Sequence, residues 1–377
     1  METCPEISVV MAVYNGEPHL VEAVWSICRQ TFREFEFIII NDGSTDGTAE
    51  ILSRYAAEDS RIRVFTQPNA GLVASLNRGC QAARGEFIAR MDADDVSLPT
   101  RLEQQIAFMR ALPRIAALGS ASQFIQDGAL LDLYERPPLR HREIMEVLFL
   151  GNPVVHPSML IRRAALEMVG YYRPLFVAAE DLDLWLRLGE RYELANLDDV
   201  LVHRRKHAEQ VTFARVVQSS MSSLAARYSS KQRRATGEDP CTRLPVINPK
   251  SLLSIGLSPA AIEAALLYTP PYRANALISR GQGDKARRIL DDLSRSMAEF
   301  PSTRLGRSVI ALLRAKSYRM EQKKLRWLVW TARAYSLNPR RIMEKVRPIR
   351  RPLPLGVSES RSPRPVKRGP MSHALQQ

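Results

Sequence analysis

Residues 35–48 read FEFIIINDGSTDGT, a run of apolar residues that ends in a loop of small and polar ones. A β-branched run of this length is typical of a strand buried on both faces, and the glycines and aspartates after it are typical of a turn into a helix. The same unit recurs at residues 7–17, ISVVMAVYNGE, and at residues 86–95, EFIARMDADD. Each stretch therefore predicts a buried strand whose C-terminal end carries polar side chains.

Amphipathic stretches alternate with these strands along the chain. Strand and helix in strict alternation predict βαβ units, and therefore an α/β fold with a mostly parallel, Rossmann-like sheet and helices on both faces. The predicted strands are residues 7–13, 35–41, 62–66 and 86–92, and the predicted helices are residues 18–30, 47–57 and 72–83.

Three polar loops are expected to meet at one edge of this sheet, because parallel strands all end on the same side. Tyr14 and Asn15 follow the first strand, Asp42 follows the second, and the carboxylates of residues 92–95 follow the fourth. Sheets of this kind bind ligands at the C-terminal ends of their strands. This edge is therefore the predicted ligand site.

The chain changes character near residue 215, where mixed strand and helix patterns give way to helix patterns alone. Residues 1–215 carry 23 Lys and Arg against 30 Asp and Glu, whereas residues 216–377 carry 31 against 10. The composition predicts an α/β domain over residues 1–215, a basic helical domain over 216–346, and a disordered tail rich in Pro and Arg over 347–377.

Cysteine spacing and hydropathy limit the location of the protein. The cysteines form no CxxC pair, which disfavours a zinc site or a disulfide framework and favours a reduced, cytoplasmic setting. No apolar stretch approaches the roughly 18 residues of a membrane span, so membrane contact is expected to be peripheral. The cysteines are Cys4, Cys28, Cys80 and Cys241.

The loop NDGSTDGT, residues 41–48, fails to match three common phosphate or metal loops. A Walker A loop needs a lysine that this loop lacks, and a dinucleotide fingerprint needs a glycine-rich loop where the chain has YNGEPH. An EF-hand that starts at Asp42 needs glutamate at its twelfth position, which is Ser53. A turn into a helix remains, with Asp46 as the N-cap and Asp42 as the functional residue.

Two groups of neighbouring acids need an explanation. Asp92, Asp94 and Asp95 raise each other's pKa unless a cation or backbone N–H groups offset their charge. An Asp-rich turn is the alternative, since aspartate tolerates turn geometry. Glu180 and Asp181 precede a predicted helix, where they are either catalytic acids or acids favoured by the helix dipole. The residues alone leave both choices open.

Four motifs, in their order and spacing, resemble those of family 2 inverting glycosyltransferases with the GT-A fold: VVMAVYNGE, IIINDGSTDGT, ARGEFIARMDADD and AAEDLDLWLRL. The resemblance covers about residues 7–212. It implies an enzyme that moves a sugar from a nucleotide-diphosphate sugar, a UDP-sugar being favoured, to a hydroxyl of a saccharide or lipid-linked acceptor. Polysaccharide biosynthesis at the cell envelope is the implied setting.

The resemblance also implies which residues face the donor. Tyr14 and Asp42 would flank the nucleotide base. Leu76 stands where many relatives have an arginine, so Arg78 is the candidate to supply that donor contact. The residues implied to line the nucleotide-sugar site are Tyr14, Asn15, Asp42, Asn69, Asn77, Arg78, Asp92 and Ala93.

A metal and a catalytic base follow from the same resemblance. Asp94 would ligate Mg²⁺ or Mn²⁺, and Asp92 would be a second ligand that lies nearer the ribose of the donor. Carboxylate oxygens suit such hard cations. Asp181 would take the proton of the acceptor hydroxyl, with Glu180 in support. His207, in RKHAEQVT, is either a third metal ligand or an exposed loop histidine.

His156 and the basic region complete the predictions. His156, in NPVVHPSMLIRR, lies on the acceptor side or is a hydrogen-bonded core histidine. Scattered aromatic residues disfavour a nucleic-acid partner for residues 216–377. A solvated helical face is the ordinary reading of such charge, and an anionic membrane at the inner face of the cell is the partner that fits better, since basic residues near a bilayer contribute about 1 kcal/mol each.

Two other functions explain the sequence less well. A sugar nucleotidyltransferase needs a GxGTR-like loop after the first strand, where this chain has VYNGEPHL. A nucleotide-sugar-binding or scaffold protein without activity gives no reason for acids at both residues 92–94 and residues 180–181.

Overall fold

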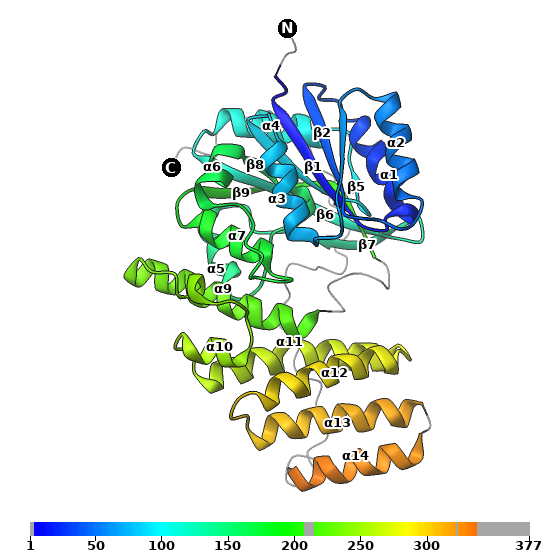
Figure 1. The fold of residues 1–377 in the computed structure, drawn as a ribbon, viewed down its shortest axis with the longest axis vertical. Helices are drawn as coiled ribbons and strands as arrows, with labels where there is room; N and C mark the ends of the chain where they lie inside the picture. Colours follow the sequence, from blue (N-terminus) through cyan, green and yellow to red (C-terminus); the bar gives the residue numbers. More distant parts are fainter. Residues whose placement is uncertain (1–3, 207–214, 322, 338–377) are drawn as a thin grey trace, which may run out of the picture.

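The computed structural model describes residues 4–206, 215–321 and 323–337. An α/β region is built on one sheet, and a helical region, residues 216–337, lies below the sheet in Figure 1. His207 and the predicted tail, residues 347–377, lie outside the described residues.

Parallel strands form the N-terminal half of the sheet: β1 (Ile7–Val13), β2 (Phe35–Asn41), β3 (Ile62–Thr66) and β4 (Phe87–Asp92). Their order is β3-β2-β1-β4, so β1 pairs with both β2 and β4. Val13 lies beside Asn41, and Ala12 lies beside Asp92. The three strand ends therefore meet at one edge, as the sequence predicts.

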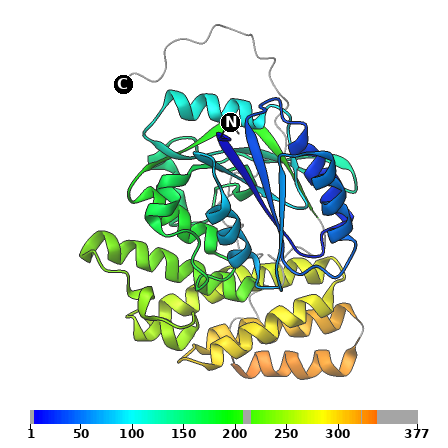
Figure 2. The same ribbon diagram turned by 45° about the horizontal axis from the view of Figure 1, so that its top comes forward.

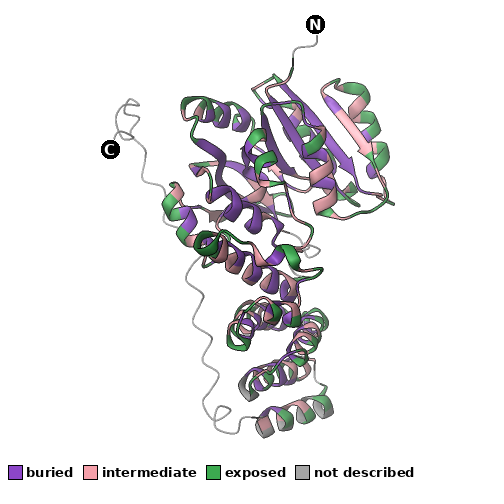
Figure 3. Cartoon of the chain, turned by 60° about the vertical axis from the view of Figure 1, so that its left-hand side comes forward, coloured by how far each residue is buried: buried purple, intermediate pink, exposed green. Residues whose placement is uncertain are grey.

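Both faces of this half-sheet are covered because its strands are apolar at almost every position. Alternate residues enter separate cores: Val9 and Ile39 pack into one, and Val10 and Ile38 into the other. In Figure 3 strands β1, β2 and β4 are buried along most of their length. The first core contains residues of α1 (Glu17–Cys28), α2 (Thr48–Glu58) and α4 (Arg101–Ala111), and the second contains residues of α3 (Leu72–Ala82), α5 (His141–Leu148), α6 (Arg163–Val169) and α7 (Glu180–Gly189).

Beyond β4 the sheet is mixed. Strand β8 runs antiparallel to both β4 and β6, and β6 runs parallel to β9. The α/β prediction with helices on both faces is confirmed, and the strictly parallel arrangement ends at β4. The strands of this half are β5 (Val96–Ser97), β6 (Ile115–Gln126), β7 (Ala129–Glu135), β8 (Leu160–Arg162) and β9 (Glu193–Arg205).

The helical region shares a core with the α/β region. Helix α9 packs against α7, and buried residues from Val10 on β1 to Ile310 on α13 belong to one apolar cluster. Figure 2 shows these helices stacked side by side. Its elements are α9 (Val216–Thr236), η2 (Pro240–Arg243), α10 (Pro249–Ser254), α11 (Pro259–Ser279), α12 (Gly283–Ala298), α13 (Arg304–Met320) and α14 (Lys324–Leu337).

Among the helices of the described residues, none is both long enough and apolar enough to cross a bilayer.

Candidate active site

Asp42 follows β2 directly and is buried, and each of its carboxylate oxygens accepts N–H hydrogen bonds. Oδ1 accepts from Nε2 of Gln67 (2.7 Å) and from the backbone of Ala70 (2.9 Å), and Oδ2 accepts from the backbone of Gly71 (2.8 Å). Burial alone would raise the pKa of Asp42, but these donors lower it below its ordinary value. Asp42 is therefore an ionised side chain that orders the loop after β3.

Asn15 joins the loop after β1 to the loop after β2. Its backbone is left-handed, with φ of 51°, a conformation that asparagine tolerates. Its Oδ1 accepts from the N–H of Thr45 (2.8 Å), and its own N–H donates to Oγ of Ser44 (3.0 Å). Tyr14, just before it, is 53% exposed. An exposed ring thus stands at the edge of the sheet beside an ordered loop.

Asn69 and Arg78 are each connected to Asp42, but in different ways. Asn69 is exposed, on the loop that Asp42 orders. Nη1 of Arg78 donates to Oε1 of Gln67 (2.9 Å), and Gln67 in turn donates to Asp42. Arg78 is therefore connected to Asp42 through one glutamine, and its direct contact with a donor stays a prediction.

The three aspartates after β4 form one cluster. Their carboxylates offer oxygen atoms within 4.8 Å of one another, and Asp95 is buried while Asp92, Ala93 and Asp94 are partly exposed. Burial raises the pKa of Asp95 well above its usual range, and the charges of Asp92 and Asp94 raise it further. Oxygen ligands at this spacing fit a hard divalent cation, whose charge would offset their repulsion.

Arg90 was not assigned a role from the sequence, although it lies two residues before Asp92 and so on the same face of β4. Its side chain is 5% exposed and forms an ion pair with Asp92. Among the described residues, its Nε has no hydrogen-bond partner. Burial raises the pKa of Glu180 and of Asp181, and the charge of Arg90 opposes both shifts. One buried cation therefore acts on both acid groups.

Arg205, at the end of β9, holds the aspartate loop in place. Its backbone N–H donates to Oδ1 of Asp95 (2.8 Å), and its Nε donates to the carbonyl of Asp94 (2.8 Å). Arg205 also forms an ion pair with Glu22 of α1. The sequence pattern RKHAEQVT drew attention to His207, whereas the structure shows that the arginine at its start contacts the cluster.

Glu180 and Asp181 occupy the first turn of α7. Glu180 is 8% exposed, and Oδ2 of the half-buried Asp181 accepts from Nδ2 of Asn152 (2.7 Å). Burial and the neighbouring charge of Asp181 raise the pKa of Glu180 to about 7, and burial raises the pKa of Asp181. A carboxylate pair with raised pKa values suits proton transfer near neutral pH.

His156 lies beside α7 as a neutral side chain. Its Nε2 shares a hydrogen bond with the hydroxyl of Tyr172 (2.8 Å), and its ring meets Trp185 edge-on at 5.8 Å. Burial lowers the pKa of His156 well below its usual value, and the charges of Arg90 and Arg204 lower it further. The hydrogen-bonded histidine expected as one alternative is thus present, on the side of the site where α7 begins.

Asn77 joins α3 to the segment that leads into α7. Its Nδ2 donates to the carbonyl of Tyr172 (2.8 Å), and its Oδ1 accepts from the N–H of Tyr172 (3.0 Å). Because both ends of the amide are used in this way, Asn77 has a structural role that the sequence did not predict. Its contact with a donor stays a prediction.

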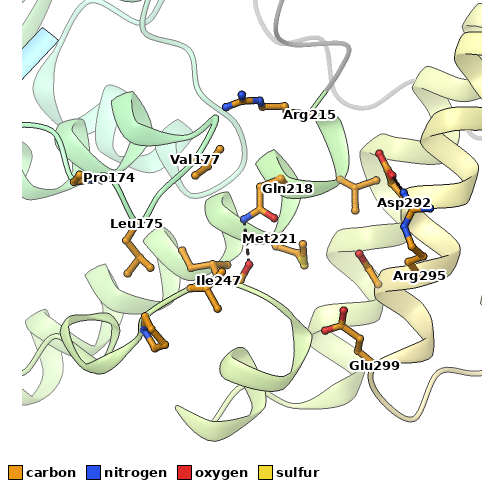
Figure 4. A pocket seen from close by; sticks show the side chains of 14 residues that line it. Pro174, Leu175, Val177, Arg215, Gln218, Met221, Ile247, Asp292, Arg295 and Glu299 are labelled. Atoms are coloured by element: carbon orange, nitrogen blue, oxygen red, sulfur yellow. Dashed lines mark hydrogen bonds and ion pairs between the residues drawn. The ribbon is translucent and has the colours of Figure 1, made fainter. Parts of the chain in front are cut away.

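A groove of about 620 Å³ lies beside this segment, between the chain just before α7 and the helical region (Figure 4). Leu175 and Val177 form one wall, and Met221 of α9 and Glu299, just after α12, lie across from them. Gln218 of α9 donates from Nε2 to the carbonyl of Ile247 (3.1 Å), which holds the loop beneath the groove.

Two acid groups and one buried cation thus define the site. The aspartates after β4 can hold a cation and, with it, a negatively charged ligand, and the acids of α7 can accept a proton. The ordered loop beside Asp42 lies two strands away from Asp92, or about 10 Å at the usual strand spacing. That distance is suitable for a ligand that extends from a base to a diphosphate.

Known proteins resemble the α/β region. The sequence model of glycosyl transferase family 2 matches residues 8–170. An uncharacterized glycosyltransferase of Haemophilus influenzae is 33% identical over 222 residues, which are 56% of this chain and 69% of that protein. An uncharacterized glycosyltransferase of Methanocaldococcus jannaschii is 35% identical over 206 residues, 53% of this chain and 71% of that protein.

Two further proteins complete the comparison. The O-antigen biosynthesis glycosyltransferase WbnJ of Escherichia coli is 31% identical over 238 residues, which are 61% of this chain and 91% of WbnJ. Among solved structures, that of S. aureus TarS 1-349 in complex with UDP-GlcNAc has a TM-score of 0.48 and 18% identity, and covers 87% of this chain and 92% of TarS 1-349.

Proposed function

The chain belongs to glycosyl transferase family 2, and on that premise we propose that it transfers a sugar from a nucleotide-diphosphate sugar to an acceptor hydroxyl by a single displacement with inversion. The proposal rests on one observation above all: the buried Arg90 forms an ion pair with Asp92 and its charge also acts on Glu180 and Asp181. A donor end and a base end are both needed for this reaction.

The donor would occupy the edge formed by the loops after β1, β2 and β4. Asp42 and the exposed Tyr14 are the residues that we propose to flank the base, and Asn69 and Arg78 lie around them. Asp94 and Asp92 would hold Mg²⁺ or Mn²⁺ close to the donor diphosphate, and their clustered oxygens support this role. A divalent ion bound there offsets the negative charge that grows on the departing nucleotide.

The α7 end would activate the acceptor. The acceptor oxygen attacks the anomeric carbon of the sugar, the bond from that carbon to the diphosphate oxygen breaks, and the hydroxyl proton passes to the carboxylate of Asp181. Asn152 holds that carboxylate in place, and Glu180 lies beside it with its own pKa raised to about 7 by burial and by the charge of Asp181. The neutral ring of His156 is proposed to lie on the acceptor side.

The acceptor and a membrane partner are proposed as chemical classes and not as individual molecules. The relative from E. coli is named for O-antigen biosynthesis, which supports saccharide or lipid-linked acceptors. Residues 216–337 carry 21 Lys and Arg against 8 Asp and Glu, which supports peripheral contact with an anionic membrane. Flotation with anionic vesicles tests this contact, and an absence of salt-sensitive binding would remove it. Residues 1–215 are proposed as the catalytic domain, and 216–346 as the basic helical domain.

The donor assignment is tested by a panel of nucleotide sugars with Mn²⁺: UDP-glucose, UDP-galactose, UDP-N-acetylglucosamine and GDP-mannose. We expect one of them to raise the melting temperature of the native protein and to release nucleotide slowly, and we expect Asp94→Ala to lose both effects. Asp132→Ala, which removes an exposed aspartate of β7, is the matched control and should behave like the native protein.

Other outcomes have distinct meanings. Stabilisation without nucleotide release or transfer would support a binding protein instead of an enzyme. If none of the four compounds stabilises the native protein, the proposed donor class is wrong.

A further inference from the structure

Helix α7 is held by buried ion pairs. Asp183, two residues after Asp181 in the first turn of the helix, is fully buried and accepts from Nε of Arg173 (2.9 Å) and from Nε of Arg187 (2.9 Å). Arg187 also donates to the carbonyls of Val169 and Tyr171. These bonds fix the helix to the chain that precedes it.

Asp239 of the helical region binds the same arginine from the other side. It is the N-cap of η2, and its Oδ2 accepts from Nη1 of Arg173 (2.7 Å) and Nη1 of Arg233 (2.6 Å). Its Oδ1 accepts from Oγ of Ser229 (2.8 Å) and from the N–H of Cys241 (3.0 Å). Burial alone would raise the pKa of Asp239, but the charges of Arg173 and Arg233 and the Ser229 bond lower it to about 2.

Arg233 closes the network at the far end of α7. Its Nε and Nη2 both donate to the carboxylate of Glu190 (2.7 Å each), the residue at the C-cap of the helix. The network therefore contains equal numbers of cations and anions, all partly or fully buried. Removing the charge of one member leaves the buried network with an excess charge of the opposite sign, which is destabilising. The members are Arg173, Asp183, Arg187, Glu190, Arg233 and Asp239.

The segment from Arg173 to the acid pair needs such an anchor. Ala178 has a φ of 58°, a conformation that is unfavourable for a non-glycine residue and persists only where the surroundings enforce it. Leu175 and Val177 are partly exposed and line the groove of Figure 4, whereas Phe176 between them is fully buried. The guanidinium of Arg173 lies over the Phe176 ring, so the ion pairs of Arg173 act at one of the points that hold the segment in place.

We propose that Asp239 is a positioning residue for sugar transfer, which fixes Glu180 and Asp181 through Arg173 and Arg233. This inference rests on the proposed function, because it takes Asp181 as the base. Asp239 lies outside residues 8–170, the part that matches the family model. The helical region would then help to position the base, whereas the loops that follow β1, β2 and β4 would bind the donor.

The test is Asp239→Asn in the full chain, with nucleotide release from the most active donor of the panel as the assay. We expect kcat to fall about 10- to 100-fold, since small displacements of a catalytic group cost that much. The KM for the donor and the thermal shift that the donor produces should remain as in the native protein. Asp239→Glu keeps the charge and should recover part of the lost kcat.

Glu321→Gln is the matched control, because it breaks another partly buried ion pair of the helical region, between Glu321 and Arg287 (2.7 Å). It should lower the melting temperature and leave kcat unchanged. If Asp239→Asn does not fold, Ser229→Ala removes a single bond to Asp239 and should lower kcat by a few-fold.

Three results would overturn the inference: a native kcat in Asp239→Asn at a temperature where the variant is folded, a native kcat in Ser229→Ala, or an equal loss of kcat in Glu321→Gln. Asp181→Asn separates these failures from a failure of the proposed function. If that variant loses transfer while Asp239→Asn keeps it, only the positioning role is wrong. If Asp181→Asn keeps transfer, the proposed base is wrong and the inference falls with it.

Discussion

The acids after β4 and the acids of α7, which we propose to act on the same ligand, are held by different parts of the molecule. Asp92 ends a strand in the parallel ladder, and Arg205 fixes the loop that follows. Glu180 and Asp181 begin a helix whose position depends on ion pairs that reach Asp239 in the helical region. The first group is set by strand pairing and by Arg205 within the α/β region, whereas the second also depends on side chains of the helical region. Changes in the helical region should therefore affect the base without affecting the donor.

Two buried acids of the site also differ in the hydrogen bonds that they accept, and therefore in their pKa values. Asp42 is surrounded by N–H donors and has a lowered pKa, whereas Glu180 is buried beside another carboxylate and has a pKa of about 7. Burial is common to both. The number of donors decides which acid stays ionised at neutral pH and which exchanges a proton there.

Asp181→Asn should have the largest effect. The amide keeps the shape of the side chain but cannot accept the acceptor proton, so transfer should fall about 10²- to 10⁴-fold. Donor-induced thermal stabilisation should stay at the native level, because the donor loops are held by the sheet. Initial rates of nucleotide release and melting curves with donor measure the two quantities. A parallel loss of stabilisation would show that the two ends of the site are not independent.

The pH profile should show the next largest effect. The raised pKa of Glu180 means that the acid pair gains its first proton as the pH falls below about 7, and burial also raises the pKa of Asp181, so the carboxylate proposed as the base is lost at a lower pH. The rate at saturating donor should therefore fall as the pH is lowered from 7 to 5, and the fall should steepen as Asp181 itself gains a proton. In Glu180→Gln the neighbouring charge is absent, so this limb should move to lower pH. A flat profile from pH 5 to 8 would contradict the assignment.

The first half of the fold was predictable because its strands are apolar runs buried on both faces. The predicted bounds of residues 7–13, 35–41 and 62–66 match β1, β2 and β3. Strand β6, with the sequence IAALGSASQFIQ, was not predicted, since its small residues have little β-propensity. Its environment comes from pairing with β7, β8 and β9, which the sequence does not reveal.

The site was predictable to the same extent. The aspartate cluster follows its strand directly, so the pattern located it. Arg90 lies inside an apolar run, and the sequence does not show that its side chain is buried and forms an ion pair with Asp92, two residues along the same strand. Asn77 and Asp239 form hydrogen bonds with residues 95 and 66 positions away in the sequence, and a local sequence pattern does not predict such long-range contacts. The predicted N-cap Asp46 is displaced by one residue: Gly47 is the N-cap, and Asp46 accepts from the N–H of Thr48.

Asp42→Asn should change the donor end alone. The variant has an amide NH₂ group in place of one carboxylate oxygen, and this group cannot accept a hydrogen bond from a backbone N–H. Part of the 69–71 loop therefore loses a hydrogen bond that holds it. The KM for the donor should rise about tenfold, which corresponds to 1.4 kcal/mol, with kcat close to native. Asp46→Asn, in the loop after β2, is the control and should leave KM unchanged. A fall in kcat without a change in KM would contradict the separation of donor and base.

Asn152→Ala should have the smallest effect and is the most selective test of the base end. Asn152 is exposed, and its Nδ2 donates to Oδ2 of Asp181 (2.7 Å), so its loss removes one bond that favours the charged carboxylate. The pKa of Asp181, already raised by burial, should rise further, and the acidic limb should move to higher pH. At pH 7 the rate should fall about twofold to tenfold, as expected for roughly 0.5–1.5 kcal/mol per hydrogen bond. Asn275→Ala, which removes a bond to Lys316 in the helical region, should leave the limb in place. If Asn152→Ala lowers the rate equally at every pH, the asparagine orients the carboxylate without tuning its charge, and the raised pKa of the pair is then set by burial, against the opposing charge of Arg90.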